Sequence, residues 1–289
     1  MEKSRQGLDT VSENIRILGK RAKMTRKQTD ICIEQLCQMA INDNDDIHAV
    51  WDMFCENAVE CDAYCGIMLC KMICEDIRYA PALVEMSVFG DTEDIGASAK
   101  NRIAYVRNKR NDKLFLDFSD RIKGAKAHYA TSFSDACEAV FNGACEYCIL
   151  PVENNKDGKL YSFYSMMDRY ELKIVQVIRE DSEDGTESTV FALAARSLVL
   201  SAKSAAGQMF EFSVINENAD FISDVIMAVN ALGGKLADVG TQPVPYDQPR
   251  RKYYFTVDPR GASAVPLALY MTMKYAGYTP VGLYNYKNK

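Results

Sequence analysis

The stretch from Thr131 to Val177 constrains the fold of this chain most strongly, because helical and strand patterns alternate along it. Apolar residues recur at helical spacing from Phe133 to Phe141, directly after a candidate N-cap at Ser132. The next apolar run, Tyr147–Pro151, is typical of a strand buried in a parallel sheet. A polar turn, a second helical pattern and a second apolar run follow. This order predicts an α/β unit.

The polar pair Glu153 and Asn154 lies immediately after the first of these predicted strands. Parallel sheets bind ligands at the loops that follow the carboxyl ends of their strands. We therefore expect Glu153 and Asn154 to be the best-placed polar pair in the chain for binding or catalysis.

A set of positions in the same stretch stands in a family-specific order: Ser132, Phe133, Glu138, Ala139, Val140, Gly143, Tyr147, Leu150, Pro151, Val152, Glu153, Asn154, Gly158 and Leu172-Lys173-Ile174-Val175. With these positions the stretch resembles prephenate dehydratase, the enzyme that makes phenylpyruvate on the way to phenylalanine. The resemblance extends from about Arg102 to Val177, resumes at Thr189 and does not include residues 1–100. It implies a lobe of the periplasmic-binding-protein-like α/β type over residues 101–200.

Two departures from that family concern its substrate cleft. A glycine-rich turn that holds substrate is replaced by the segment 107–112, which has no glycine and is expected to be a solvated turn. The family's second lobe follows the last matched strand, but here only Ile178–Ser188 separates Val177 from Thr189. Eleven mostly polar residues cannot build a lobe, so we expect a solvent loop. The loop at Glu153 and Asn154 should then lie open or under residues 1–100.

A third departure concerns catalysis. Thr189 matches the threonine of the family's catalytic Thr-Arg-Phe motif, but Val190 replaces the arginine. Valine offers neither a charge nor a hydrogen bond to a dianionic substrate. The resemblance thus implies catalytic positions at Thr189, Glu153 and Asn154 in a degenerate site.

Residues 205–289 show a second pattern, with strands, helices and strands in the order βαββαβ, which is ferredoxin-like. The pattern resembles an ACT domain, the regulatory module in which two turns bind phenylalanine at a dimer interface in prephenate dehydratases. The resemblance implies ligand-binding positions at Asn216, Asn218, Ala219, Phe221, Gln242 and Pro243. Several family residues at these turns are replaced, so we expect weak phenylalanine binding. We also expect a homodimer with an amino-acid ligand at the ACT-like domain.

Residues 1–100 are predicted to form a helical module, with separate helices before and after a capping box at Thr25 and Gln28 and a third helix from His48 through Met72. The position resembles the chorismate mutase part of bifunctional chorismate mutase–prephenate dehydratases, so chorismate mutase activity is one alternative. A basic cluster could instead contact nucleic acid, but a solvated helix face is more common and the net charge of the chain is −6, so we expect no nucleic-acid partner. The cluster consists of Arg16, Lys20, Arg21, Lys23, Arg26 and Lys27.

The remaining composition favours a cytoplasmic protein. The start of the sequence has no apolar core of a signal peptide, and no apolar run reaches membrane length. The ten cysteines are expected to be reduced and packed in the core. One helix could not bring Cys61, Cys65, Cys70 and Cys74 to one metal ion, and we expect no metal and no cofactor.

The sequence as a whole predicts a multidomain α+β protein that is a prephenate-dehydratase-like pseudoenzyme. The preferred hypothesis is an amino-acid-sensing or regulatory protein of aromatic amino-acid biosynthesis. The alternative is an active prephenate dehydratase whose site is completed by a partner subunit or by the helical module.

Overall fold

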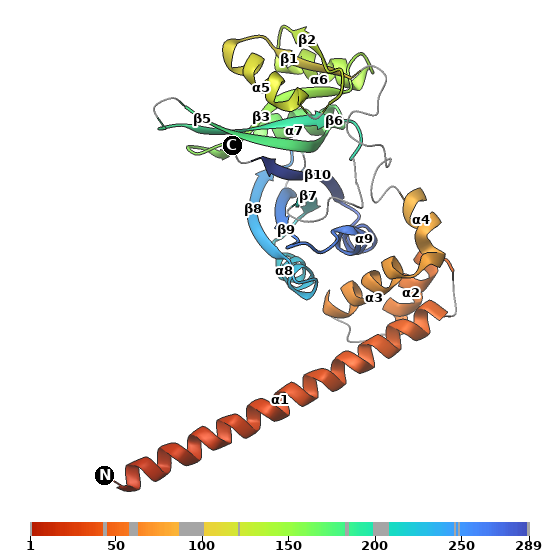
Figure 1. Cartoon of the computed structure of the whole chain (residues 1–289). Coiled ribbons are helices and arrows are strands. Elements are labelled where there is room, and N and C mark those ends of the chain that lie inside the picture. Colours follow the sequence, from red (N-terminus) through yellow and green to blue (C-terminus); the bar gives the residue numbers. More distant parts are fainter. Residues whose placement is uncertain are drawn as a thin grey trace.

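The computed structural model describes residues 2–42, 45–57, 63–86, 101–120, 122–182, 185–198, 208–245, 247 and 249–287. Three parts follow one another along the chain (Figure 1). Residues 2–86 form the helical module, 102–195 form the lobe and 208–287 form the C-terminal domain. The predicted domain boundaries at 100 and 200–205 fall between these groups of elements and stay a prediction.

The helical module begins with α1 (Glu2–Asn42), a single helix of 41 residues that extends away from the rest of the molecule (Figure 1). The predicted break at Thr25 is wrong, because the Thr25 hydroxyl donates to the carbonyl oxygen of Arg21 at 3.1 Å inside the helix. A Thr hydroxyl can satisfy itself on the preceding turn without capping anything. The predicted third helix is also wrong as one element. It consists of α2 (Ile47–Asn57) and α3 (Ala63–Glu75), followed by a 3₁₀ turn (Ile77–Tyr79) and α4 (Ala80–Glu85).

The cysteines of the module do not all pack in the core. Cys65 and Cys70 are buried on α3, and burial raises the pKa of the Cys70 thiol. Cys32 and Cys55 are exposed, so the core prediction is wrong for these two. Cys61 lies outside the described residues.

The lobe is a mixed sheet with helices on both faces. Its strands are β1 (Arg102–Val106), β2 (Lys126–Ala130), β3 (Tyr147–Asn154), β4 (Gly158–Lys159), β5 (Lys173–Asp181) and β6 (Ser188–Ala195). Strands β2, β1 and β3 are parallel, as expected, whereas β6 and β5 continue the sheet antiparallel. Helix α5 (Lys109–Ser119) packs on one face, and α6 (Phe133–Phe141) and α7 (Tyr161–Arg169) pack on the other.

Local signals in the lobe are partly confirmed. Ser132 caps α6, since its side chain accepts a hydrogen bond from the Asp135 amide at 3.0 Å. The expected solvated turn at 107–112 is wrong from Lys109 onward. The Asn108 side chain accepts from the Asn111 amide at 2.8 Å and begins α5 there.

The predicted solvent loop after Val177 is a β-hairpin. Strand β5 continues to Asp181, with Ile178 and Glu180 buried, and β6 begins at Ser188. The Ser182 amide donates to the Glu187 carbonyl oxygen at 2.7 Å and closes the hairpin. The prediction of a loop is wrong for residues 178–181, because pairing with β6 satisfies the backbone of these mostly charged residues.

The C-terminal domain has the predicted βαββαβ order. It consists of β7 (Gln208–Asn216), α8 (Ile222–Ala231), β8 (Lys235–Pro243), β9 (Arg251–Asp258), α9 (Val265–Lys274) and β10 (Tyr278–Lys287). The strand order is β10-β7-β9-β8, which is ferredoxin-like. Strand β10 also pairs in parallel with β5, so the lobe and the C-terminal domain share one ten-stranded sheet.

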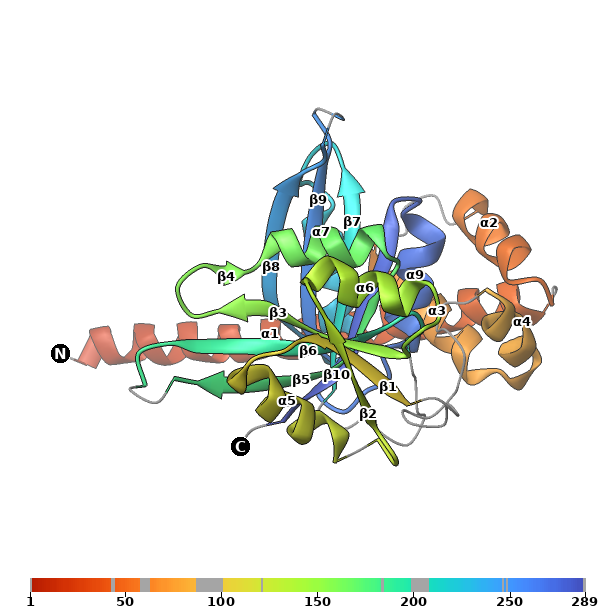
Figure 2. The ribbon, with the colours of Figure 1, turned by 90° about the horizontal axis from the view of Figure 1, so that it is seen from above.

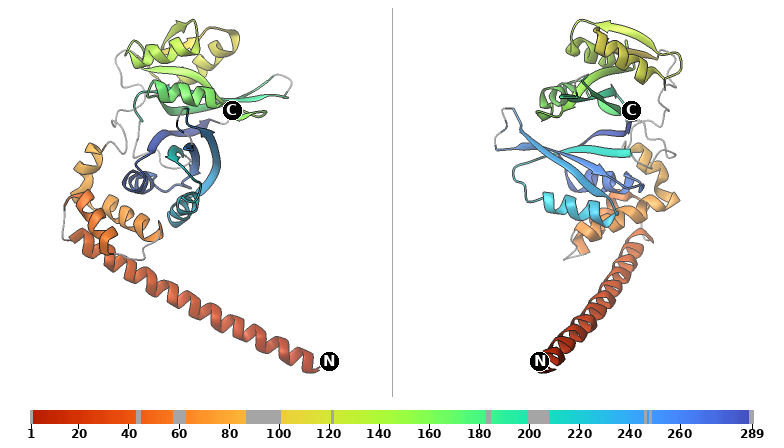
Figure 3. Two further views of the ribbon diagram at one scale, coloured as in Figure 1. Left: turned by 180° about the vertical axis from the view of Figure 1, so that it is seen from behind. Right: turned by 60° about the vertical axis from the view of Figure 1, so that its left-hand side comes forward.

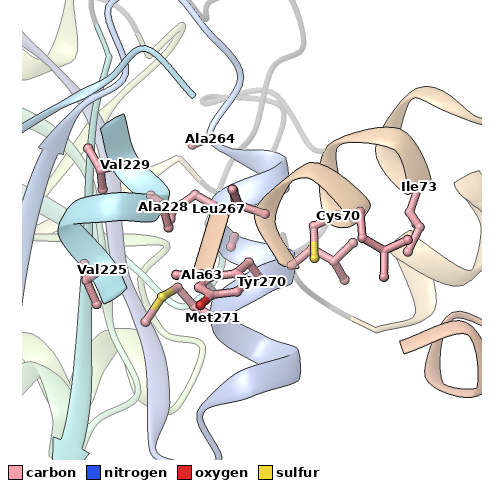
Figure 4. Close-up of a cluster of buried hydrophobic side chains, with 14 of the residues drawn as sticks. Ala63, Cys70, Ile73, Val225, Ala228, Val229, Ala264, Leu267, Tyr270 and Met271 are labelled. Carbon is pink, nitrogen blue, oxygen red and sulfur yellow. The ribbon is translucent and has the colours of Figure 1, made fainter. Parts of the chain in front are cut away.

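Each face of the C-terminal sheet is covered by a different part of the chain. Helices α8 and α9 cover one face, and α3 of the helical module packs onto them (Figure 4). Gly66 permits this approach, because a Cβ there would lie 2.9 Å from the Tyr270 ring. Helix α7 of the lobe lies across the opposite face (Figure 2). The C-terminal domain therefore sits between the helical module and the lobe (Figure 3).

Within the described ranges, no helix is both long enough and apolar enough to cross a membrane. The cytoplasmic location stays a prediction.

Candidate functional site

A hollow of about 630 Å³ lies where the lobe meets the edge of the C-terminal sheet. We call it the junction hollow. Its lobe side includes Glu153 at the end of β3, the β3–β4 turn and Arg179 on β5. Its other side is β8, the last strand in the sheet order. The predicted opening to solvent is confirmed for the turn after Asn154, since residues 155–158 are exposed. Glu153 itself is half-buried, and the wall opposite it comes from the C-terminal domain rather than from residues 1–100.

The predicted polar pair is split between two roles. The structure places Glu153 and Asn154 in the last residues of β3 rather than in the loop after it. Glu153 lines the hollow. The Asn154 carboxamide makes its hydrogen bonds within the turn that follows it. Its Oδ1 accepts from the backbone amides of Lys156 at 2.9 Å and Asp157 at 2.6 Å, and its Nδ2 donates to the Asp157 carboxylate. Asn154 thus shapes the turn that carries Asp157 and Lys159.

Lys159 is the buried cation beneath the hollow. Its side chain is 7% exposed, and its ammonium forms an ion pair with the fully buried carboxylate of Glu211 on β7. The same ammonium donates to the Thr256 hydroxyl at 3.0 Å and to the Tyr164 hydroxyl at 3.3 Å. An ammonium has three protons, so these three acceptors use all of them.

The Glu211 carboxylate is correspondingly saturated. Besides Lys159, it accepts from the hydroxyls of Tyr164 at 2.9 Å and Tyr284 at 2.8 Å. Burial by itself lowers the pKa of Lys159, but the adjacent Glu211 carboxylate outweighs it, so the pKa is raised. The pair is a buried, hydrogen-bonded junction between the lobe and the C-terminal domain.

Three tyrosine rings extend this junction along α7. The ring centroids of Tyr161 and Tyr164 lie 5.7 and 5.1 Å from that of Tyr254 on β9. The Tyr254 hydroxyl donates to Asp168 at 3.2 Å and accepts from Gln242 at 3.0 Å. Burial, followed by the Asp168 carboxylate, raises the pKa of Tyr254. The phenol is therefore a neutral donor at physiological pH.

Gly240 on β8 fits against the Tyr161 phenol. A Cβ at this position would lie 2.0 Å from the Tyr161 hydroxyl oxygen and 3.2 Å from Cζ. Only glycine allows the strand to approach α7 this closely. The approach fixes the wall of the junction hollow.

The predicted catalytic residue Thr189 lies on β6 directly beside Asn154 in the register. It is half-buried and does not line the hollow. Val190, the position of the missing arginine, is 3% exposed within the lobe core. Nearby, the buried Glu180 carboxylate accepts from Arg110 at 2.9 Å and Lys113 at 3.1 Å. Arg110 and Lys113, both on α5, are thus paired with a buried carboxylate of the lobe.

The predicted ligand positions of the C-terminal domain do not form one cluster. Asn216 and Asn218 each accept a backbone amide in the β7–α8 turn, and Pro243 lies across Arg251 at the same end of the sheet. Ala219 is exposed in that turn. Phe221 is buried on the helical face, 5.1 Å from the Tyr253 ring. Gln242 faces α7. Their ligand-binding role stays a prediction.

Sequence reasoning missed Lys159, Arg179, Glu211 and Asp238. One signal was present: Glu211 interrupts the apolar run of β7, between Phe210 and Phe212. Alternation would place it on a solvated face, and the sequence does not reveal that α7 covers that face. Among the described residues, no group of three or more His, Cys, Asp or Glu side chains could hold a metal ion.

No protein-family model matches the chain, and no curated protein matches its sequence. Solved structures do match. GqqA, described as a novel type of quorum quenching acylase, has a TM-score of 0.51 and 15% identity over 65% of this chain and 96% of its own. Prephenate dehydratase from Streptococcus mutans has a TM-score of 0.51 and 14% identity, over 65% of this chain and 99% of its own. Prephenate dehydratase from Arthrobacter aurescens, in complex with L-Phe, has a TM-score of 0.50 and 11% identity, over 64% of this chain and 90% of its own.

These similarities show that the chain has a prephenate-dehydratase-like fold. Proteins described by two different activities share this fold, so the fold by itself does not choose the activity.

Proposed function

We propose that this protein is a non-catalytic relative of prephenate dehydratase that senses a small molecule, in a regulatory role in aromatic amino-acid metabolism. The observation that carries the proposal is the β5–β6 hairpin. It joins Val177 to Thr189 directly at the point where the resemblance places the second lobe of the substrate cleft. A site between two lobes needs both of them.

The remaining charges support the same conclusion. Dehydration with loss of carbon dioxide requires a cation on the substrate dianion and a proton donor near the leaving hydroxyl. Val190 supplies neither, and Arg110 and Lys113 are bound to Glu180. A ligand-binding role requires only a shaped pocket, and the lobe and the C-terminal domain form one together.

A steady-state assay of the purified full chain tests this proposal, with prephenate and chorismate in parallel. We expect no phenylpyruvate at an ordinary enzyme rate of about 1 s⁻¹ or more. An active prephenate dehydratase added to the same mixture controls for inhibition. Turnover of prephenate would favour the alternative, an enzyme whose site is completed by a partner subunit or the helical module. Turnover of chorismate alone would assign chorismate mutase activity to residues 1–100.

A further inference from the structure

We propose that the junction hollow is a binding site for a free α-amino acid, with the ammonium group held by Glu153 and Asp238 and the carboxylate by Arg179. The proposal rests on the proposed small-molecule-sensing function and assigns it a place and a ligand class. It places the ligand between the lobe and β8, away from the β7–α8 turn.

The size of the hollow fits a small ligand. Its volume of about 630 Å³ lies within the range of roughly 300–1,000 Å³ that small-molecule sites occupy. Its walls come from two parts of the chain that the Lys159–Glu211 pair and the α7 rings hold together. Packing between the lobe and the C-terminal domain thus holds the two walls of the hollow opposite each other.

The charges that line the hollow have both signs. Lys159 contributes little free charge, because Glu211 neutralises it and its three protons have acceptors. Its ammonium lies 3.9 Å from the Asp238 carboxylate, which is beyond a hydrogen bond, and the Asp238 side chain is 56% exposed. Glu153 and Asp238 therefore present carboxylates from opposite walls, which suits a ligand ammonium.

Arg179 supplies the opposite sign on the lobe wall. Arg179 already makes an interaction within the protein. Because a guanidinium carries five N–H donors, it can bind a ligand carboxylate in addition. Met209, Val239 and the Tyr161 ring line the same hollow and provide apolar contact for a side chain. A zwitterionic head group with an attached apolar side chain matches this lining.

Isothermal titration calorimetry on the full chain tests the proposal, with the twenty standard amino acids as probes. For each amino acid that binds, two analogues are titrated in the same way. The decarboxylated amine lacks the carboxylate, and the 2-oxo acid lacks the ammonium group. We expect at least one amino acid to bind, and both analogues to bind at least about tenfold more weakly, since each loses one charge-assisted contact. An analogue that binds as tightly as the amino acid would overturn the two-point recognition.

Variants locate the site. We expect Glu153→Gln and Asp238→Asn each to weaken binding about tenfold or more, and Arg179→Met to do the same. The matched control is Asp52→Asn on α2, an exposed carboxylate outside both candidate sites, which should leave the affinity unchanged. Asn218→Ala tests the competing site in the β7–α8 turn. Asp238 is exposed, so its isosteric replacement tests binding without unfolding the chain.

If Asn218→Ala abolished binding and the hollow variants did not, the ligand would sit at the turn and the hollow proposal would fall, while the sensing function would stand. If no amino acid bound the wild type, the hollow proposal would also fall, and the prephenate assay would still decide whether the chain is an enzyme.

Discussion

The Lys159 ammonium forms an ion pair with the carboxylate of Glu211, and these side chains, 7% and 0% exposed, join the lobe to the C-terminal sheet. A lysine and a glutamate lose several kcal/mol of hydration each when they are buried, so a pair of this kind persists only when its hydrogen bonds are satisfied. Here Tyr164, Tyr284 and Thr256 supply the remaining partners. The pair therefore fixes the geometry of the junction hollow more than it stabilises the protein.

Removing one partner of this pair should be costly. We expect Lys159→Met or Glu211→Leu alone to lower the free energy of unfolding by about 3–5 kcal/mol, because the other charge stays buried. The double variant should cost less than the sum of the two. Urea unfolding at neutral pH measures all three, with Lys274→Met as the control. Lys274 pairs with Asp224 at 2.8 Å but is about a third exposed, so its loss should cost less than about 1 kcal/mol. Additive costs at Lys159 and Glu211 would contradict the coupling.

The same pair predicts a loss of stability at alkaline pH. The folded-state pKa of Lys159 is raised above its unfolded value, so the folded state holds the proton more tightly. Its contribution is fully present below the unfolded pKa of about 10.4 and is lost as the pH rises through the raised folded value. The difference in unfolding free energy between the wild type and Lys159→Met should therefore shrink above about pH 10.4. Both chains contain the same tyrosines, so the contribution of tyrosine ionisation to the pH dependence of stability cancels in this difference. A difference that stays constant with pH would contradict this assignment.

Gly240 should not tolerate a side chain. We expect Gly240→Ala to destabilise the protein by about 1–3 kcal/mol, because its Cβ would collide with the Tyr161 hydroxyl. Adding Tyr161→Phe removes the closest atom, so the double variant should recover part of the loss. Thermal unfolding measures both, and Val239→Ala on the neighbouring, partly exposed position is the control. The absence of any rescue would show that the strain lies elsewhere.

An arginine at position 190, where the resembled motif has one, should not produce a prephenate dehydratase. Val190→Arg places a charge at a position that is 3% exposed, so we expect a loss of about 3 kcal/mol or more and no prephenate turnover. The matched control is Leu116→Arg on α5, which is 62% exposed and should change stability by less than about 0.5 kcal/mol. A stable Val190→Arg chain that forms phenylpyruvate would contradict both the burial argument and the non-catalytic proposal.

The order of the elements could be predicted from the sequence. Apolar periodicity, the Ser132 cap and the βαββαβ pattern are local signals, and the structure confirms the helix Phe133–Phe141 at its predicted bounds. Local signals gave wrong predictions where more than one backbone conformation is compatible with the same residues. Thr25 can bond the preceding helical turn as well as cap a new one, and the charged segment 178–181 can pair as a strand.

The candidate site was decided by tertiary structure. From the sequence, Glu153 is one polar residue after a strand and Glu211 is a polar interruption of another, 58 positions later in the same numbering. They belong to one junction only because β5 pairs with β10 and α7 covers the face of β7. Periodicity determines which face of an element is apolar, but it does not determine which distant element covers the other face. Local sequence patterns are therefore sufficient to predict the elements and their order. The position and lining of the junction hollow depend on the packing of α7 against β8, which only the tertiary structure shows.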